Sequence, residues 1–285
     1  MNLAALDAKG PRQVTPDHAL ADTRQAFDGV AADYDRRNSA NRVLSDMRTR
    51  IRQTIGTHVP AGSRLLDLGC GPGADTAWLA TCGHRVTAID WSPAMVQEAR
   101  SRLAAIPELE SRVNVQPLGI HELDRLAPAI FDAAVANFGP LNCVTDLPAA
   151  ACSIARRLRS GGVLVAAVIG RLCPWEIALY LARRDWSRVC VRFTTRMQPV
   201  PLDGRTVWTH YYSVSEFERA FRPCGFSRTS LRALGLVAPP PYLEAFTARH
   251  PTLVGRLQRI EDYVSEWPGI RSWGDHFLIV LRKAA

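Results

Sequence analysis

The chain has 285 residues, of which 47% are hydrophobic and 22% are charged, and its formal net charge is +8 at pH 7. This length and composition indicate a soluble globular protein with one large domain, or one domain with an inserted cap. No apolar stretch approaches the ~20 residues that span a bilayer, which argues against a membrane protein. The positive charge comes mostly from arginines spaced along predicted helices, as in RRNSANRVLSDMRTRIR at residues 36–52, so it indicates a solvated face and disfavours a nucleic-acid partner.

The first residues of the chain do not show the basic and apolar regions of a signal peptide. We expect residues 1–21 to form a flexible leader and residues 22–285 to form a single domain. Residues 22–58 favour one or two helices before the first strand.

From residue 63 onward, short β-rich runs alternate with helical stretches, which is typical of βαβ units and a parallel sheet. Several of the runs are continuously apolar, as expected where helices cover both faces of a sheet. Ser92 followed by Pro93 predicts a helix start, and Ser213 with Glu216 forms a capping box before another helix. The candidate strands cover residues 63–69, 84–90, 112–117, 131–138 and 161–170.

Two later regions interrupt this alternation and read as cap insertions. Residues 171–212 predict a helix and then a hairpin around Asp203-Gly204. Residues 237–273 contain a triple proline, which we interpret as a rigid linker, and then a helical stretch. A last strand is predicted at residues 275–283.

The seven cysteines are scattered without a CxxC pair. Their odd number disfavours a disulfide framework. We therefore expect a cytoplasmic protein with reduced thiols.

A glycine-rich corner, DLGCGPG at residues 67–73, follows the first predicted strand. A P-loop would need GxxxxGK[ST], and the Lys-Ser/Thr pair is missing. A dinucleotide loop fits loosely through Gly69, Gly71 and Ala74, with Asp90 placed for a ribose hydroxyl, so the glycine spacing alone leaves the ligand open. The carboxylate of Asp67 would repel a pyrophosphate, whereas it suits a cationic ligand.

This corner resembles the first motif of class I S-adenosylmethionine-dependent methyltransferases, and the resemblance extends over roughly residues 27–281. AIDWSPAMVQEAR, FDAAVANF, LRSGGVLVAAVIG and YYSVSEFERAFRPCGF are similar to later segments of that family in the same order. The resemblance implies a Rossmann-like α/β fold with seven mostly parallel strands, the last one antiparallel. It also implies S-adenosylmethionine as cofactor, transferase activity of the 2.1.1 class and a small-molecule acceptor.

The resemblance also implies which residues bind the cofactor. Asp67 and the glycine loop would lie beside the methionine part, Asp90 would accept the ribose hydroxyls, and Trp91 and Met95 would enclose the adenine. The family's usual acid after the third strand is replaced by Gly119, so the backbone of Gly119 and Ile120 would take over its contact. The implied cofactor-binding residues are Tyr34, Asp67, Gly69, Cys70, Gly71, Asp90, Trp91, Met95, Gly119, Ile120, Asn137 and Phe138.

The acceptor site is sought in the cap, because methyl transfer is a displacement that depends mainly on positioning. A general base is needed only where the acceptor carries a proton. His210 is our first candidate for that base, with Tyr211 and Glu176 as further catalytic candidates; alternation places His210 and Tyr211 on opposite faces. The candidate acceptor contacts are Asn142, Trp175, Trp208 and His276.

The resulting hypothesis is methyl transfer to an oxygen or nitrogen atom of a small molecule. Hydrolase and metalloenzyme motifs such as GxSxG and HExxH are missing. The alternatives are an RNA or protein methyltransferase, a nicotinamide-dependent oxidoreductase, and a cofactor-binding regulatory module. Oligomeric state stays open.

Overall fold

A computed structural model describes residues 14–285. Its centre is a seven-stranded sheet in the order β3-β2-β1-β4-β5-β9-β8, in which β9 is antiparallel to both of its neighbours and the adjacent pairs from β3 to β5 are parallel. The predicted sheet is thereby confirmed. The strands are β1 (Arg64–Leu68), β2 (Arg85–Asp90), β3 (Val113–Pro117), β4 (Phe131–Ala136), β5 (Leu158–Ile169), β8 (Phe226–Leu234) and β9 (His276–Lys283).

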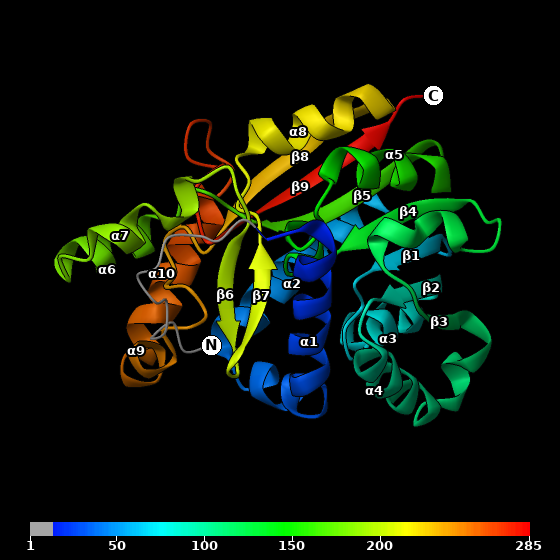
Figure 1. Ribbon diagram of the computed structural model, residues 1–285, viewed down its shortest axis with the longest axis horizontal. Helices are drawn as coiled ribbons and strands as arrows, with labels where there is room; N and C mark the ends of the chain where they lie inside the picture. Colours follow the sequence, from blue (N-terminus) through cyan, green and yellow to red (C-terminus); the bar gives the residue numbers. More distant parts are fainter. Residues whose placement is uncertain (1–13) are drawn as a thin grey trace.

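Helices cover both faces of this sheet (Figure 1). On one face, α5 (Leu147–Arg157) and α8 (Val214–Phe221) share a core with Leu66 and Leu68. On the other face, α2 (Arg42–His58), α3 (Ala74–Thr81) and α4 (Pro93–Ala104) pack with Leu65. Neighbouring residues of one strand therefore point to opposite cores, which explains the continuously apolar strand sequences.

The two predicted helix starts are confirmed. The Ser92 hydroxyl accepts a hydrogen bond from the amide of Met95 at 3.1 Å, at the start of α4. Ser213 and Glu216 bond each other's amide N–H groups at the start of α8. Both helices therefore begin where the local sequence satisfies their free N–H groups.

The N-terminal helix begins earlier than expected. α1 (Pro16–Ser39) starts after Thr15, whose side chain accepts a hydrogen bond from the amide of His18. Residues 16–21 of the expected leader are thus helical, and residues 1–13 lie outside the described residues. A Thr N-cap followed by proline at the first helical position accounts for this start.

The two cap insertions carry the remaining main elements. The first contains α6 (Pro174–Ala182), α7 (Trp186–Val189), β6 (Gln198–Leu202) and β7 (Arg205–Thr209), and the last two form the predicted hairpin. The second contains α9 (Glu244–Arg249) and α10 (Pro251–Val264). In Figure 1, these four helices gather beside the sheet, and the hairpin lies next to α1. Short 3₁₀ helices are η1 (Pro107–Arg112), η2 (Ile120–Arg125), η3 (Pro140–Asn142), η4 (Val191–Phe193) and η5 (Arg222–Cys224).

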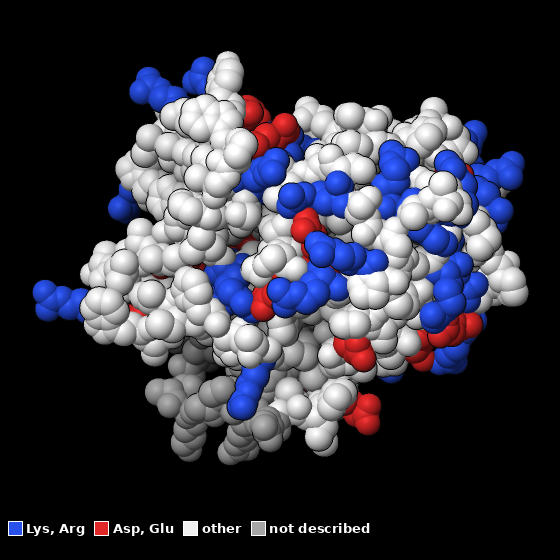
Figure 2. All heavy atoms as spheres, turned by 90° about the horizontal axis from the view of Figure 1, so that it is seen from above, with Lys and Arg blue, Asp and Glu red and all other residues white. Residues whose placement is uncertain are grey.

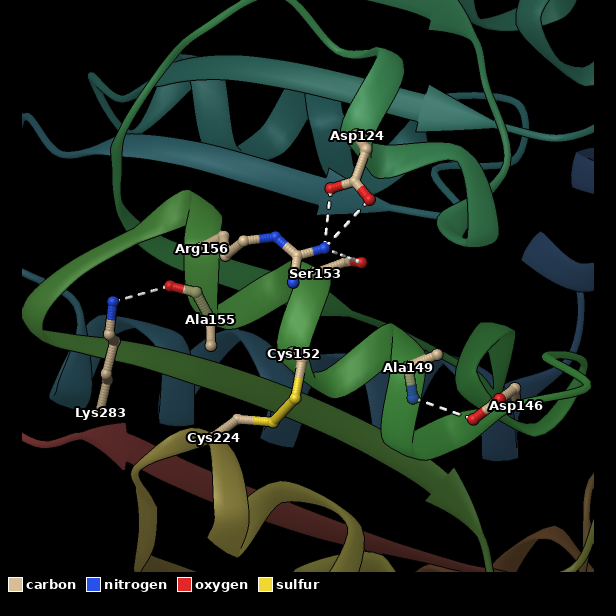
Figure 3. The surroundings of a disulfide bond; sticks show 9 residues. All are labelled: Asp124, Asp146, Ala149, Cys152, Ser153, Ala155, Arg156, Cys224 and Lys283. Carbon is tan, nitrogen blue, oxygen red and sulfur yellow. Dashed lines mark hydrogen bonds and ion pairs between the residues drawn. A yellow bond between two sulfur atoms is a disulfide. The ribbon is translucent and has the colours of Figure 1, made fainter.

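One disulfide joins Cys152 of α5 to Cys224 of η5, 72 residues apart in sequence (Figure 3). The prediction of reduced thiols is therefore wrong for this pair. Spacing could not reveal it, because the two cysteines meet only when α5 and the turn after α8 pack together, with their Cα atoms 5.2 Å apart. Five other cysteines are free.

The surface is rich in arginine on the face shown in Figure 2, where acidic residues lie among the basic ones. Three ion pairs of the α5–α8 side illustrate this mixing, namely Arg156–Asp124, Arg171–Glu216 and Arg228–Glu218. Within residues 14–285, no helix has the length and apolarity needed to cross a membrane.

Candidate active site

The glycine loop leaves β1 and leads into α3 with three glycines at positive φ: Gly69 at 71°, Gly71 at 53° and Gly73 at 79°. A Cβ on Gly69 would lie 2.5 Å from the Cβ of Pro140, so Gly69 is needed for the close approach of η3. A Cβ on Gly71 would have no neighbour within 4 Å. Gly71 therefore presents bare backbone to open space, as a ligand cradle requires.

Asp67 lies beneath this loop and is only 2% exposed. Its carboxylate accepts a hydrogen bond from the hydroxyl of Thr76 at 2.6 Å. Burial raises the pKa of Asp67 to about 7, and the negative charges of Asp75 and Asp90 add to this effect. A cation beside Asp67 would relieve this penalty, whereas a pyrophosphate would increase it. The site thus fits an ammonium group.

Asp90 ends β2 and links the glycine loop to α4. One carboxylate oxygen accepts the N–H of Gly71 at 2.8 Å, and the other accepts the N–H of Ser92 at 2.9 Å. Burial raises the pKa of Asp90 to about 6, although these two bonds oppose the rise. Each oxygen retains a further lone pair, so the carboxylate can accept two neighbouring hydroxyls.

The segment that follows the end of β3 lies beside Trp91. The ring of Trp91 meets His121 edge to face, with centroids 4.5 Å apart, and its N–H donates to the carbonyl of Leu20 at 3.3 Å. A Cβ on Gly119 would lie 2.9 Å from Trp91 and closer still to His121, so a side chain at this position would have to displace these rings. Sequence reasoning missed His121, whose one signal was its place two residues after Gly119.

Two other predicted residues near this edge are buried. Met95 is 1% exposed and packs on Val30 and Ala31 of α1. Ile120 is 7% exposed and belongs to the core on the α5 side. Both side chains therefore serve in the packing of this edge, Met95 against α1 and Ile120 in the core on the α5 side.

An ion cluster lies beyond the glycine loop at the end of β4. The Asn137 amide donates to Asp75 at 3.2 Å, and Arg48 lies 3.3 Å from the same carboxylate oxygen. The Arg48 guanidinium also lies 5.2 Å from the ring centroid of Phe138, which adopts a positive φ of 57°. Burial is the main cause that raises the pKa of Tyr34, with Arg48 opposing it. α1, α2, α3 and β4 therefore converge at this end.

Sequence analysis missed the arginines of this cluster, because it interpreted the basic stretch before the sheet as a solvated face. Arg52 donates two hydrogen bonds to Asp75, at 2.8 and 3.0 Å. Arg50 is 3% exposed and bonds Asp46 and the carbonyl of Gln258. That interpretation is wrong for these arginines, which bond acidic groups and backbone carbonyls of other elements.

On the cap side, Arg192 of η4 is buried and joins two carboxylates. Its Nε and one Nη donate to Glu176 of α6, and the same Nη donates to Asp275. The other Nη donates to the carbonyls of Gly170 and Asp275. These five bonds match the five N–H groups of a guanidinium.

His276 follows Asp275 at the start of β9. Its Nδ1 lies 3.0 Å from the second oxygen of Asp275 and has no well-formed hydrogen bond. Its ring meets that of Phe138 edge to face, with centroids 6.2 Å apart. Burial by itself would raise the pKa of Asp275. The positive charge of Arg192 is the strongest of the effects that oppose burial, and the pKa of this carboxyl is lowered. His276 thus stands between the ionised cap cluster and the end of β4.

Comparisons with known proteins agree with this geometry. Residues 65–162 match a family described as "Methyltransferase domain". The demethylmenaquinone methyltransferase of Tropheryma whipplei is 29% identical over 219 residues, which cover 76% of this chain and 89% of that protein. The malonyl-[acyl-carrier protein] O-methyltransferase of Pseudescherichia vulneris is 27% identical, covering 85% of this chain and 88% of that protein. The chain is a class I S-adenosylmethionine-dependent methyltransferase.

The fold of this methyltransferase also matches a solved structure, that of the 1,6-didemethyltoxoflavin-N1-methyltransferase of Burkholderia thailandensis with bound 1,6-didemethyltoxoflavin and S-adenosylhomocysteine. The TM-score is 0.60 at 18% identity, with 99% of this chain and 98% of that chain covered. S-Adenosylmethionine is the cofactor and supplies a methyl group on a positively charged sulfur. Which residue contacts which part of the cofactor stays a prediction, including the predicted role of Cys70, which is buried beside Gly71.

The remaining predicted residues of the methyltransferase have the following places. Asn142 is fully buried, and its amide bonds the backbone of Ile169 and His210, so it ties the ends of β5 and β7 together. The His210 ring stacks on Tyr212, with centroids 4.2 Å apart, and burial lowers its pKa. Tyr211 lies instead under the Arg192 guanidinium at 5.0 Å. The expected divergence of His210 and Tyr211 is confirmed.

Both predicted tryptophans tie cap elements together. The N–H of Trp175 donates to the carbonyl of Val237 at 2.9 Å. Trp208 donates its indole N–H to Asp22 at 2.9 Å and its backbone N–H to Thr23 at 3.0 Å, which fastens β7 to α1. A small pocket between α6 and the hairpin is lined by Glu176 and Tyr211 among others.

Proposed function

We propose that this methyltransferase transfers its methyl group to an oxygen or nitrogen atom of a small-molecule acceptor enclosed between the sheet and the cap. One observation carries the proposal: α1 is bonded to both sides of the site. The carbonyl of Leu20 accepts a hydrogen bond from the indole N–H of Trp91, and the carboxylate of Asp22 accepts one from the indole N–H of Trp208. A helix fastened over both sides suits a small enclosed acceptor better than a nucleic-acid strand, which needs an open groove.

The relatives support the same acceptor class through their names. Demethylmenaquinone and the malonyl group named above, and the trans-aconitate of a Paracidovorax citrulli enzyme that is 50% identical over 68 residues, or 22% of this chain, are all small groups or molecules. 1,6-Didemethyltoxoflavin, bound in the similar solved structure, is another. On the cofactor side, we assign Asp67 to the ammonium and Asp90 to the ribose hydroxyls.

The test has a binding arm and a transfer arm. Calorimetry is expected to show binding of S-adenosylhomocysteine and no binding of NADH. Incubation with methyl-labelled S-adenosylmethionine and a deproteinised metabolite extract is expected to label small products that organic solvent or ion exchange can separate. Label found only in RNA or protein, when total cell extract is used, would contradict the proposed acceptor class.

A further inference from the structure

A cluster of rings and charged groups lies around Arg192, Asp275 and His276. Its members come from the end of β4, α6 and the segment before it, η4, the end of β7, the linker before α9 and the start of β9. The groups that face the cluster are Phe138, Cys173, Glu176, Arg192, Tyr211, Tyr242 and Asp275. Among the ionised ones, Glu176 and Asp275 are negative and Arg192 is positive, so the cluster carries one net negative charge.

Arg192 cannot serve an anionic acceptor without losing bonds that it already makes. All five of its N–H groups are engaged with Glu176, Asp275 and the carbonyl of Gly170. A carboxylate placed here would meet two other carboxylates and a saturated cation, which is unfavourable in a buried site.

The hydroxyl of Tyr242 is buried in this cluster without a hydrogen-bond partner, whereas Nδ1 of His276 lies 3.0 Å from a carboxylate oxygen of Asp275. Burial, with the charges of Glu176 and Asp275 adding to it, raises the pKa of Tyr242, so its hydroxyl keeps its proton and can donate. Buried polar groups are normally satisfied, and an unsatisfied one indicates a missing partner. An acceptor with a hydroxyl group would supply one.

On the basis of the proposed function, we propose that the acceptor is a neutral molecule with an ionisable hydroxyl, and that His276 is the catalytic base that removes its proton. Asp275 is the positioning residue that holds the proton on Nδ1, so that the lone pair of Nε2 faces the acceptor. Arg192 positions Asp275 in turn.

The acceptor oxygen forms a bond to the methyl carbon, while the bond from that carbon to sulfur breaks and its electron pair stays on the sulfur. The hydroxyl proton moves to Nε2 of His276. The net negative charge of the cluster stabilises the imidazolium, which then releases the proton to water.

A matched pair of probes tests the substrate class. 1-Naphthol and 1-naphthoic acid share one ring system and differ in offering a hydroxyl or a carboxylate. With labelled S-adenosylmethionine, we expect 1-methoxynaphthalene from the first and no methyl ester from the second. Preferential methylation of 1-naphthoate, or methylation of neither compound, overturns the inference. Binding of S-adenosylhomocysteine in the same preparation shows separately whether the proposed function stands.

The variant His276→Gln tests the base. Turnover of 1-naphthol is expected to fall about 10²- to 10⁴-fold, with the loss of the limb of the pH–rate profile that rises with pH. 4-Nitro-1-naphthol, which is already ionised at neutral pH, should lose far less. Affinity for S-adenosylhomocysteine should be unchanged. Equal losses on both naphthols overturn the role of His276 as base.

Two further variants distinguish an effect on the catalytic step from a general effect of changing a cap residue. His250→Gln, which changes an exposed histidine of the cap, should leave both naphthol rates unchanged. Asp275→Asn should lower kcat for 1-naphthol more than it changes KM, because it disturbs the orientation of His276 and not the binding surface. A change in KM alone would remove Asp275 from its positioning role.

Discussion

The cofactor side and the cap side of this site are assembled in different ways. On the cofactor side, Gly71 bonds Asp90, 19 residues further along the chain, across adjacent parallel strands. On the cap side, Arg192 bonds Asp275, 83 residues away, and its helical turn belongs to an insertion. The first arrangement follows from a recurrent sheet topology, whereas the second depends on how this particular cap packs.

The two sides also differ in charge balance. Burial raises the pKa values of Asp67 and Asp90, and their bonds from neutral donors do not offset it. Asp275 is equally buried, yet it faces Arg192 and has a lowered pKa. The carboxylates of the cofactor side would therefore be stabilised by a cationic ligand, while Asp275 on the cap side already has its cation in Arg192.

The largest effect is expected for Arg192→Met on the cap side. This change leaves two buried carboxylates without their cation, and breaking such a buried cluster costs about 3–5 kcal/mol. Urea unfolding should therefore show a lower free energy of unfolding. Arg196→Met, at an exposed position nearby in sequence, is the matched control and should change little. Equal effects of the two variants would mean that the cap cluster does not stabilise the fold.

The positions of Asp67 and Asp90 in the fold were predictable from the sequence for a physical reason. Strand periodicity placed Asp67 and Asp90 at the carboxyl ends of adjacent strands, and the topology of a parallel sheet brings such ends together. The capping residues Ser92 and Ser213 also act locally, so their helix starts were predictable.

The cap side and the buried arginines could not be predicted in this way. Arg192 and Arg48 look like surface residues in the sequence, and only their tertiary partners, Glu176 and Asp75, show that Arg192 is buried and Arg48 half-buried in ion clusters. Little in the sequence indicates a role for His276, because its neighbour Asp275 is ion-paired with Arg192, which belongs to a distant insertion. The disulfide was missed for the same reason.

The next largest effect concerns Asp67. Its pKa is about 7 in the fold, against 3.8 as the ordinary value, so the ionised form is penalised in the folded state. The penalty is absent below about pH 4, grows as the pH rises toward 7, and is complete above it. Asp67→Asn should therefore raise the free energy of unfolding of the cofactor-free enzyme by about 2–4 kcal/mol at pH 8, and by little at pH 4.

Urea unfolding across this pH range measures whether Asp67→Asn raises or lowers the free energy of unfolding. Asp132→Asn is the contrasting variant, because the Arg64 amide and Arg159 lower the pKa of Asp132, so its removal should destabilise the enzyme at pH 8. Asp67→Asn should also weaken S-adenosylhomocysteine binding. A variant that destabilises the cofactor-free enzyme at pH 8 would contradict the difference in charge balance between the two sides.

A smaller effect is expected for Asp90→Ala on cofactor affinity. Loss of the carboxylate leaves the ribose hydroxyls without acceptors in a closed site, which should weaken binding by about 1–3 kcal/mol in calorimetry. Glu110→Ala, at an exposed position, is the control. Unchanged affinity would remove Asp90 from its assigned role.

The smallest effect tests the connection between the two sides. Trp208→Phe keeps a smaller aromatic ring but removes the indole N–H that bonds Asp22 of α1 at 2.9 Å, and one such bond to a charged group contributes about 1.5 kcal/mol. Trp186→Phe is the matched control, because Trp186 is 67% exposed. If α1 closes the site from the hairpin, Trp208→Phe should raise the KM for the acceptor several-fold and hardly change the affinity for S-adenosylhomocysteine, since the Trp91–Leu20 bond is intact. Equal weakening of acceptor and cofactor binding would show that α1 acts as one rigid cover over both sides.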